Sequence, residues 1–175
     1  MDVLQVPFTS AAFLLAIAGV QKLRDPHPLS RALRLAKLPN DTKAVRSLAA
    51  IEIATAVCAV VIHHRVVPLV VAALYLSFAV FVTWALARSL PLESCGCFGR
   101  ADARPSAAHV ALDAFAATIA VLVAFDHVEP VGTLIADHPA EGIAVVAVSA
   151  ILASLATAWL RGTLTRGAKR AATIS

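Results

Sequence analysis

Two of the three cysteines stand close together in Ser94-Cys95-Gly96-Cys97-Phe98-Gly99-Arg100, separated by one glycine. A thiolate is a nucleophile, a metal ligand and one half of a disulfide, so two adjacent thiols favour exchange chemistry. Gly96 can take backbone conformations closed to other residues, which helps Cys95 and Cys97 to meet in a small ring. Strained disulfides have high reduction potentials and are readily exchanged. The spacing therefore predicts a redox-active dithiol at Cys95 and Cys97.

The same pair of sulfurs allows two other interpretations. Pointing the same way, they would chelate a soft ion such as Cu(I) or Zn(II). A structural zinc site normally takes four ligands, so two cysteines do not make one. A purely structural role for the pair is the remaining alternative.

The composition around this motif is that of a membrane protein. Of the 175 residues, 59% are hydrophobic and 15% charged, and the mean hydropathy is +0.81. Long apolar runs of this kind exclude a soluble domain and leave little chain for a second one. The net charge of +4 comes from basic residues in short connections between apolar runs, without interleaved aromatics. This distribution fits membrane topology and excludes nucleic-acid binding.

Five apolar runs are long enough to cross a hydrocarbon core of about 30 Å, which takes about 17–25 helical residues. They lie at 6–23, 45–62, 66–87, 106–125 and 140–160. Their length and the lack of strict apolar/polar alternation favour helices over a barrel. We therefore predict an all-α, polytopic transmembrane helix bundle in a single domain, residues 1–160, with a basic, frayed tail at 161–175.

The basic residues predict an orientation. All the lysines and arginines except Arg65 fall in three stretches: 22–46, 88–104 and 161–170. With five spans, those stretches share one side of the membrane, and the other side carries Asp126, Glu129, Asp137 and Glu141. We expect the chain in the inner (cytoplasmic) membrane of the cell. The positive-inside rule then puts the N-terminus outside, and the C-terminus and the Cys-Gly-Cys connection in the cytoplasm.

Residues 28–38 carry Arg31, Arg34 and Lys37 on one face at helical spacing, with Leu29 and Leu33 on another. This pattern predicts a short helix in the membrane interface, with its basic residues towards anionic headgroups. A solvated basic loop is the alternative.

Four ionisable residues fall inside the predicted spans, where charge is costly and needs an explanation. Lys22 ends the first span, Glu52 lies in the second, and His109 and Asp113 share one face of the fourth because they are four residues apart. We expect these four to form a buried cluster beneath the dithiol. Such a cluster would accept protons from thiols during exchange, or would simply pair to hold the bundle together.

The other cysteine and histidines give weaker signals. Cys58 lies towards the far end of the second span and is expected to be a packing residue. His63 and His64 are adjacent at that end and could bind a metal only with further ligands. The sequence thus predicts no metal site.

Three features carry a resemblance to a known family. They are the string Ser94 to Gly99 closing a membrane helix, the end of the first span from Ala18 to Pro26, and a glutamate in the second span, Glu52. In these the chain resembles the MauE family of the DoxX-like superfamily, over roughly residues 10–125. The resemblance implies a four-helix DoxX-like core followed by a fifth helix, and family cysteines and glycines at Cys95, Cys97, Gly96 and Gly99.

The resemblance also implies a redox-associated function. MauE proteins are tied to methylamine utilisation, where they act with a thioredoxin-like partner in maturing a disulfide-rich subunit of methylamine dehydrogenase. For this chain it implies thiol–disulfide exchange with a thioredoxin-like protein or a larger membrane complex, with a quinone as the cofactor that could complete the electron path. A non-enzymatic subunit or scaffold, and a copper-handling protein, remain the alternatives.

Overall fold

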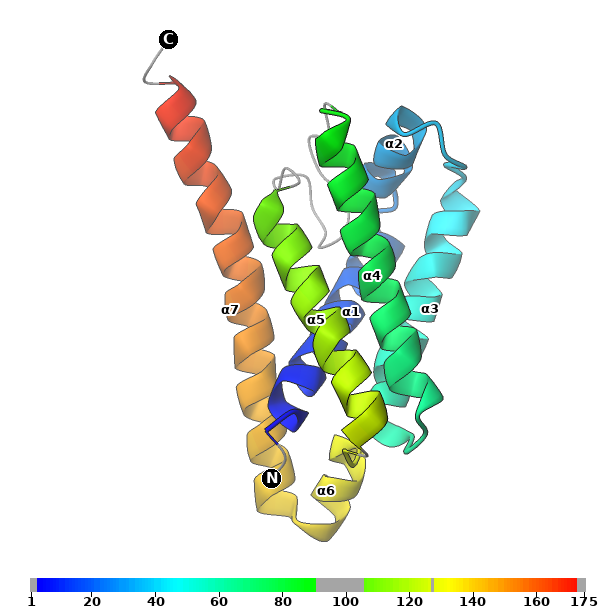
Figure 1. Ribbon diagram of the computed structural model, residues 1–175, viewed down its shortest axis with the longest axis vertical. Coiled ribbons are helices and arrows are strands. Elements are labelled where there is room, and N and C mark those ends of the chain that lie inside the picture. The colour runs from blue at the N-terminus through cyan, green and yellow to red at the C-terminus, as the bar shows by residue number, and fades with distance from the viewer. Residues whose placement is uncertain (1–2, 91–105, 127, 173–175) are drawn as a thin grey trace.

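A computed structural model describes residues 3–90, 106–126 and 128–172, with side chains described as far as Ala158. Over these residues the chain forms seven helices and no strand (Figure 1). They are α1 (Gln5–Arg24), α2 (His27–Leu35), α3 (Thr42–Val61), α4 (Val66–Ala87), α5 (Ala107–Asp126), α6 (Val131–Asp137) and α7 (Pro139–Ala172). The prediction of an all-α fold is confirmed.

Five of the helices in the described part of the chain, α1, α3, α4, α5 and α7, are long and apolar enough to span a membrane. They coincide with the five predicted spans, and α4 begins and ends at the predicted residues. The protein is therefore a multi-pass membrane protein. Hydropathy predicts these helices well because a segment in hydrocarbon must satisfy its own backbone hydrogen bonds.

The helix that contains the last span is longer than the predicted span, 140–160. The apolar window covers Pro139–Ala158, but α7 continues to Ala172 where a frayed tail was expected. Hydropathy marks only where a helix leaves the hydrocarbon. The helix itself continues because residues 161–172 contain several strong helix formers and no proline.

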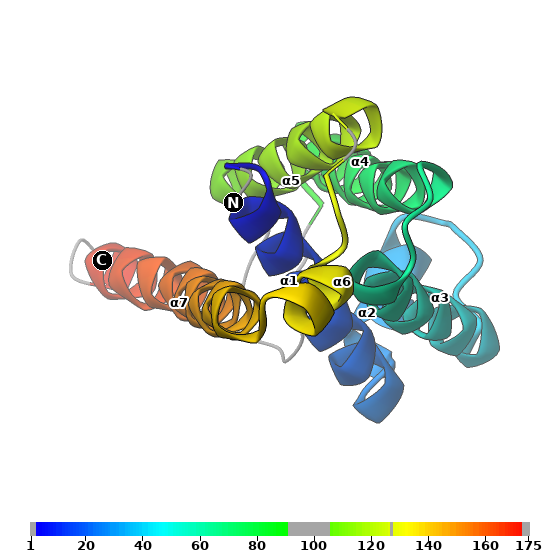
Figure 2. The ribbon, with the colours of Figure 1, turned by 90° about the horizontal axis from the view of Figure 1, so that it is seen from below.

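The spans pack as two antiparallel pairs, α1 with α3 and α4 with α5, and α1 also contacts α5 and α7 (Figures 1 and 2). Phe8, Leu15, Tyr75, Phe78 and Val82 form the bulk of the core. Many of the remaining core residues are alanines, which let the helices approach closely without large side chains between them.

The helices α1 and α3 approach each other closely at Gly19. A Cβ added there would lie 2.7 Å from Ile53 Cγ1 and 2.8 Å from the carbonyl oxygen of Ala49. Both distances are shorter than carbon contacts allow, so only glycine fits at this position. The spacing of the two helices at this level is therefore fixed by the missing side chain.

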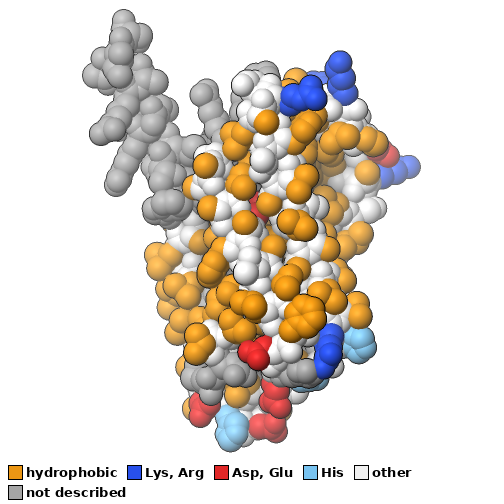
Figure 3. All heavy atoms as spheres, in the orientation of Figure 1, with side chains coloured by type: hydrophobic (Ala, Val, Ile, Leu, Met, Phe, Trp, Pro, Cys, Tyr) orange, Lys and Arg blue, Asp and Glu red, His pale blue; other side chains and the backbone are white. Residues whose placement is uncertain are grey.

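The surface separates into an apolar belt and two charged ends (Figure 3). Large apolar side chains are exposed on the outer faces of the spans, among them Ile51, Val57, Leu76, Phe115 and Ile143. In a bilayer these faces contact lipid tails. Lys22, Arg24, Arg88 and the α2–α3 connection mark one end, here called the basic end; Arg65, Asp126, Glu129 and Glu141 mark the other, the acidic end.

Both ends carry a short helix. The predicted interfacial helix is present as α2, at the basic end; its contact with headgroups stays a prediction. The helix α6 at the acidic end was not predicted, because seven residues are too few for a hydropathy or periodicity signal. It lies against the end of α3, where a Cβ at Gly132 would come 2.7 Å from the carbonyl oxygen of Val60.

The helices α2 and α4 end in the same kind of turn at the basic end. Lys37 (φ 57°) and Ser89 (φ 48°) take the left-handed conformation without being glycines. Leu38 N then donates to Leu33 O at 2.9 Å, and Leu90 N to Ala85 O at 3.1 Å. These bonds are those of a Schellman turn, which satisfies the last helix carbonyls. The turn after α4 directs Leu90 back onto Ala32 and Ala85, immediately before the segment that holds the cysteines.

Replacing Gly19 by alanine should force α1 and α3 apart. We expect Gly19→Ala to lower the free energy of unfolding by about 1–3 kcal/mol, the usual effect of overpacking. Unfolding in detergent micelles, followed by far-UV circular dichroism, measures this. The control is Val20→Ala on the exposed side of the same turn, expected within about 0.5 kcal/mol of the parent. Equal stability of Gly19→Ala and Val20→Ala would contradict the close approach.

Candidate functional site

The strongest polar contact in the core joins Lys22 to Glu52. Lys22 Nζ donates to both carboxylate oxygens, at 2.7 Å to Oε1 and 2.9 Å to Oε2. The side chains are 2% and 0% exposed. The pair connects α1 to α3 as a fully buried ion pair. Because an isolated charge in this environment is strongly unfavourable, each residue needs the other.

Three features of the sequence position this pair. Lys22 lies near the end of α1, one turn after Gly19, so the close approach at Gly19 brings its chain onto α3. Glu52 lies near the middle of α3, with Ala49 and Ala56 on the same buried face. The ammonium group also lies 5.0 Å from the centre of the Phe78 ring of α4, a cation–π contact. Lys22 thereby connects three helices.

The second half of the predicted cluster lies on α5. His109 and Asp113 are 1% and 0% exposed and occupy the same face, one helical turn apart. The Nδ1 atom of His109 lies 2.8 Å from the hydroxyl oxygen of Ser106, just before the start of α5. That hydrogen bond fixes the orientation of the imidazole ring at the basic end of the helix.

Tyr75 of α4 is buried and adds a further polar group to the core. Its hydroxyl donates a hydrogen bond of 2.7 Å to the carbonyl oxygen of Ala11 in α1. It also lies within electrostatic range of both Glu52 and Asp113. The sequence analysis missed this residue. The available signal is that Tyr75 is the single tyrosine of the chain, inside an apolar run, where a buried hydroxyl needs a partner.

Lys22, Glu52, His109 and Asp113 are all buried, and that they form one cluster beneath the dithiol stays a prediction. By their positions along α1, α3 and α5 they lie between the middle of the bundle and the basic end, the end at which α4 ends and α5 begins (Figure 1). Cys95, Gly96 and Cys97 lie outside the described residues. The role of the four residues, proton acceptors or structural pairing, stays a prediction.

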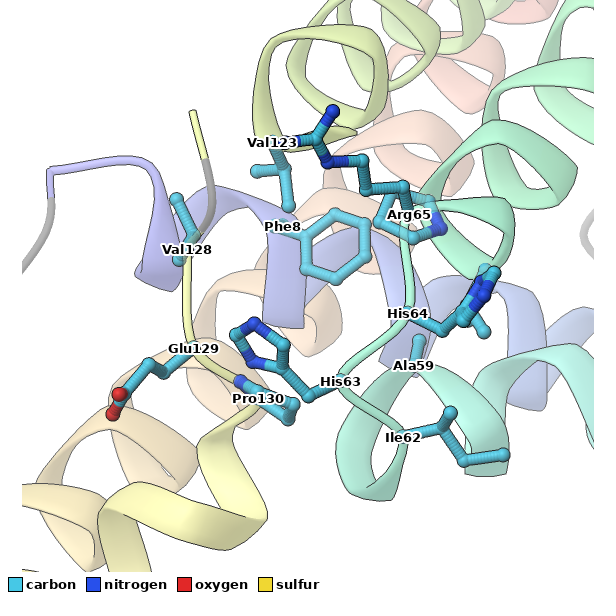
Figure 4. Close-up of a pocket in the computed structure, with 12 residues that line it drawn as sticks. Phe8, Ala59, Ile62, His63, His64, Arg65, Val123, Val128, Glu129 and Pro130 are labelled. Atoms are coloured by element: carbon cyan, nitrogen blue, oxygen red, sulfur yellow. The ribbon is translucent and has the colours of Figure 1, made fainter. Parts of the chain in front are cut away.

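A cavity of about 330 Å³ lies away from this cluster, at the acidic end. Figure 4 shows its apolar wall, with Phe8, Val123 and Val128, and its ionisable rim. The rim consists of His63, His64, Arg65 and Glu129. The end of α3 at Val61 is about 13 Å beyond Glu52, at ~1.5 Å per residue, and His63 follows after the helix. This cavity and the buried cluster are thus separate sites.

Neither the cavity nor the cluster makes a metal centre in the described part of the chain. No group of three or more His, Cys, Asp or Glu side chains is placed there to hold an ion. One ring nitrogen of His64, Nδ1, accepts from the backbone N–H of Val66 at 3.2 Å. Cys58 is a free, half-buried cysteine on α3 between the two sites.

Taken together, the fold and the buried ion pair define a five-span helical membrane protein with a polar core near its basic end. The chain belongs to the MauE family: residues 3–126 match the family described as methylamine utilisation protein MauE. The match covers α1 to α5 and ends before α6 and α7. Comparison with curated proteins and with solved structures gave no match.

Removing one member of the Lys22–Glu52 pair should lower the stability of the protein far more than removing both. We expect Lys22→Met and Glu52→Leu each to cost about 3–5 kcal/mol of stability, because each leaves a buried charge without its partner. The double variant should recover most of that loss. Unfolding of all four proteins in the same detergent gives the double-mutant cycle. Additive single effects would mean that the pair is not coupled.

Proposed function

We propose that this protein carries out thiol–disulfide exchange at the membrane through Cys95 and Cys97, with a thioredoxin-like protein as partner. Family membership and the Cys-Gly-Cys spacing support this chemistry. The observation that carries the proposal is the position of the buried polar residues. They lie towards the same end of the bundle at which α4 ends and α5 begins, and the cysteine-bearing segment joins those two helices.

The exchange is written for the oxidised pair. A thiolate of the partner attacks one sulfur of the Cys95–Cys97 disulfide, forms a mixed disulfide and releases the other cysteine as a thiolate. The partner's second thiolate then attacks the mixed disulfide and leaves oxidised. The partner loses two electrons, and Cys95 and Cys97 gain them. A quinone would restore the disulfide by taking up two electrons and two protons.

The buried residues would serve the protons in this cycle. Each turn moves two protons between thiols and their surroundings, and ionisable side chains near the thiols could hold those protons close to the reacting sulfurs. His109, at the basic end of α5, and the carboxylates of Asp113 and Glu52 deeper in the bundle could accept and return protons. The ammonium group of Lys22 would stabilise the ionised form of Glu52 when these side chains hold no proton taken from a thiol.

We propose the same orientation that the charges predict, with the basic end and the cysteines on the cytoplasmic side. Arg24, Arg31, Arg34, Lys43 and Arg88 support it, since cytoplasmic connections carry an excess of basic residues. On that side thiols are mostly reduced, so any disulfide would be transient and catalytic.

Single cysteine variants should trap the partner. In Cys95→Ser or Cys97→Ser the remaining thiolate can attack the disulfide of the oxidised partner and form a mixed disulfide, with the partner's other sulfur leaving as a thiolate. This chain then has no second thiolate with which to release the partner. We expect one of the two to accumulate an adduct that non-reducing electrophoresis detects and a reductant removes. Cys58→Ser is the matched control and should accumulate none.

Other results would favour the alternatives. If neither variant forms an adduct and the thiols do not respond to redox potential, the proposal of thiol–disulfide exchange is wrong. Unchanged assembly and activity of a larger complex with both cysteines replaced by serine would favour a scaffold. Stoichiometric Cu(I) binding that the double variant loses would favour metal handling.

The orientation has its own test, a membrane-impermeant thiol reagent applied to intact cells. Cys97→Ser combined with Cys58→Ser leaves Cys95 as the only thiol, with no internal disulfide partner. We expect Cys95 to be protected in intact cells and labelled after permeabilisation. A reporter at the acidic end, Glu129→Cys in a chain without other cysteines, should be labelled from outside. The reverse pattern would place the cysteines outside the cell membrane.

A further inference from the structure

A polar hollow of about 250 Å³ lies at the basic end, beside α2. It is lined by His27, Ser30, Arg31, Arg34 and Asn40. The first four come from α2, and Asn40 comes from the connection to α3. None of these lining residues is acidic. The lining therefore offers hydrogen-bond donors and positive charge.

The geometry of α2 creates this hollow. Positions 27, 30, 31 and 34 follow helical spacing and share one face. The opposite face buries Leu29, Ala32 and Ala36, at 6%, 1% and 8% exposure. Ala32 packs with Ala85 of α4. Because the apolar face is held against the bundle, the face with the two arginines must point away from it.

Two carboxylates near α2 in the chain accept hydrogen bonds from the backbone. Asp25 Oδ1 accepts from the backbone N–H of His27 at 3.2 Å, and Asp41 Oδ1 accepts from the backbone N–H of Lys43 at 3.2 Å. Asp41 is the N-cap of α3. The hydroxyl oxygen of Ser30 is buried and has no hydrogen-bond partner among the described residues. A guanidinium carries five N–H donors, so arginines with contacts inside the protein can still bind a phosphate oxygen.

The level of the hollow indicates where its ligand comes from. The span α1 ends at Arg24 and the span α3 begins at Thr42, so residues 27–40 lie where the hydrocarbon ends. Phospholipid headgroups occupy that level, and arginine forks match the geometry of phosphate. We propose that this hollow binds the phosphate group of an anionic phospholipid. The proposal is independent of thiol exchange, because it uses none of the same residues.

The test compares two variants with equal loss of charge. Arg31→Gln/Arg34→Gln removes both arginines of the hollow, and Lys43→Gln/Arg46→Gln removes two exposed basic residues of α3 outside it. Native mass spectrometry of the full chain in detergent measures binding of phosphatidylglycerol, phosphatidylcholine and inorganic phosphate. We expect one phosphatidylglycerol per chain in the parent and an affinity loss of roughly tenfold or more in the first variant, the effect of a lost charge-assisted hydrogen bond. The second variant should keep parental affinity.

The measurements with the second variant, phosphatidylcholine and inorganic phosphate can each overturn the proposal. An equal loss in both variants would mean diffuse attraction between charges and overturn it. Phosphatidylcholine binding as tightly as phosphatidylglycerol would overturn it too. Inorganic phosphate binding as tightly as the lipid would make the free ion the ligand and overturn the lipid assignment. Asn40→Asp replaces the side-chain amide by a carboxylate of the same shape and so adds a negative charge at the rim. This variant should also weaken phosphatidylglycerol binding. It serves as the second variant if the double arginine variant does not fold.

Discussion

The absence of water in the bilayer is the constraint on which this structure depends, and Lys22 and Glu52 show its effect. Neither an ammonium nor a carboxylate can be buried alone in hydrocarbon, so the two must meet. Their contact at 2.7 Å sets the register of α1 on α3. Gly19, one turn earlier, permits the approach that the contact requires. The positions of Phe78 and Tyr75 on α4 then follow from packing around the same level.

The sequence predicted the spans and the buried charges for one physical reason. Apolar runs of sufficient length leave few alternatives in lipid, and the rare charged residues within them must pair. Lys22, Glu52, His109 and Asp113 were found by that argument alone. The MauE resemblance was also available from the residues, and the family match confirms it over residues 3–126.

What the sequence did not predict depends on contacts between distant segments. The partner of the Tyr75 hydroxyl is a backbone carbonyl, that of Ala11, which has no sequence signature. The exclusion of a side chain at Gly19 depends on the distance between two helices. The short helix α6 is held by packing on α3, not by its own pattern. The hollow beside α2 needs Asn40, which lies outside the helical repeat that the sequence displays. The arrangement of Cys95 and Cys97 lies outside the described residues.

The pairing of the spans has a mechanical consequence. The bulk of the contacts between spans lies within the α1–α3 pair and within the α4–α5 pair, with fewer between α3 and α4 or between α1 and α5. Gly19 and the Lys22–Glu52 contact hold the first pair as one rigid body. The segment with the cysteines connects the two helices of the second pair in the sequence. Sliding of one pair against the other would therefore alter the distance from the ends of α4 and α5 to Glu52 without breaking either pair. The cation–π contact of Lys22 with Phe78 and the hydrogen bond from Tyr75 to Ala11 both join the two pairs and resist that movement.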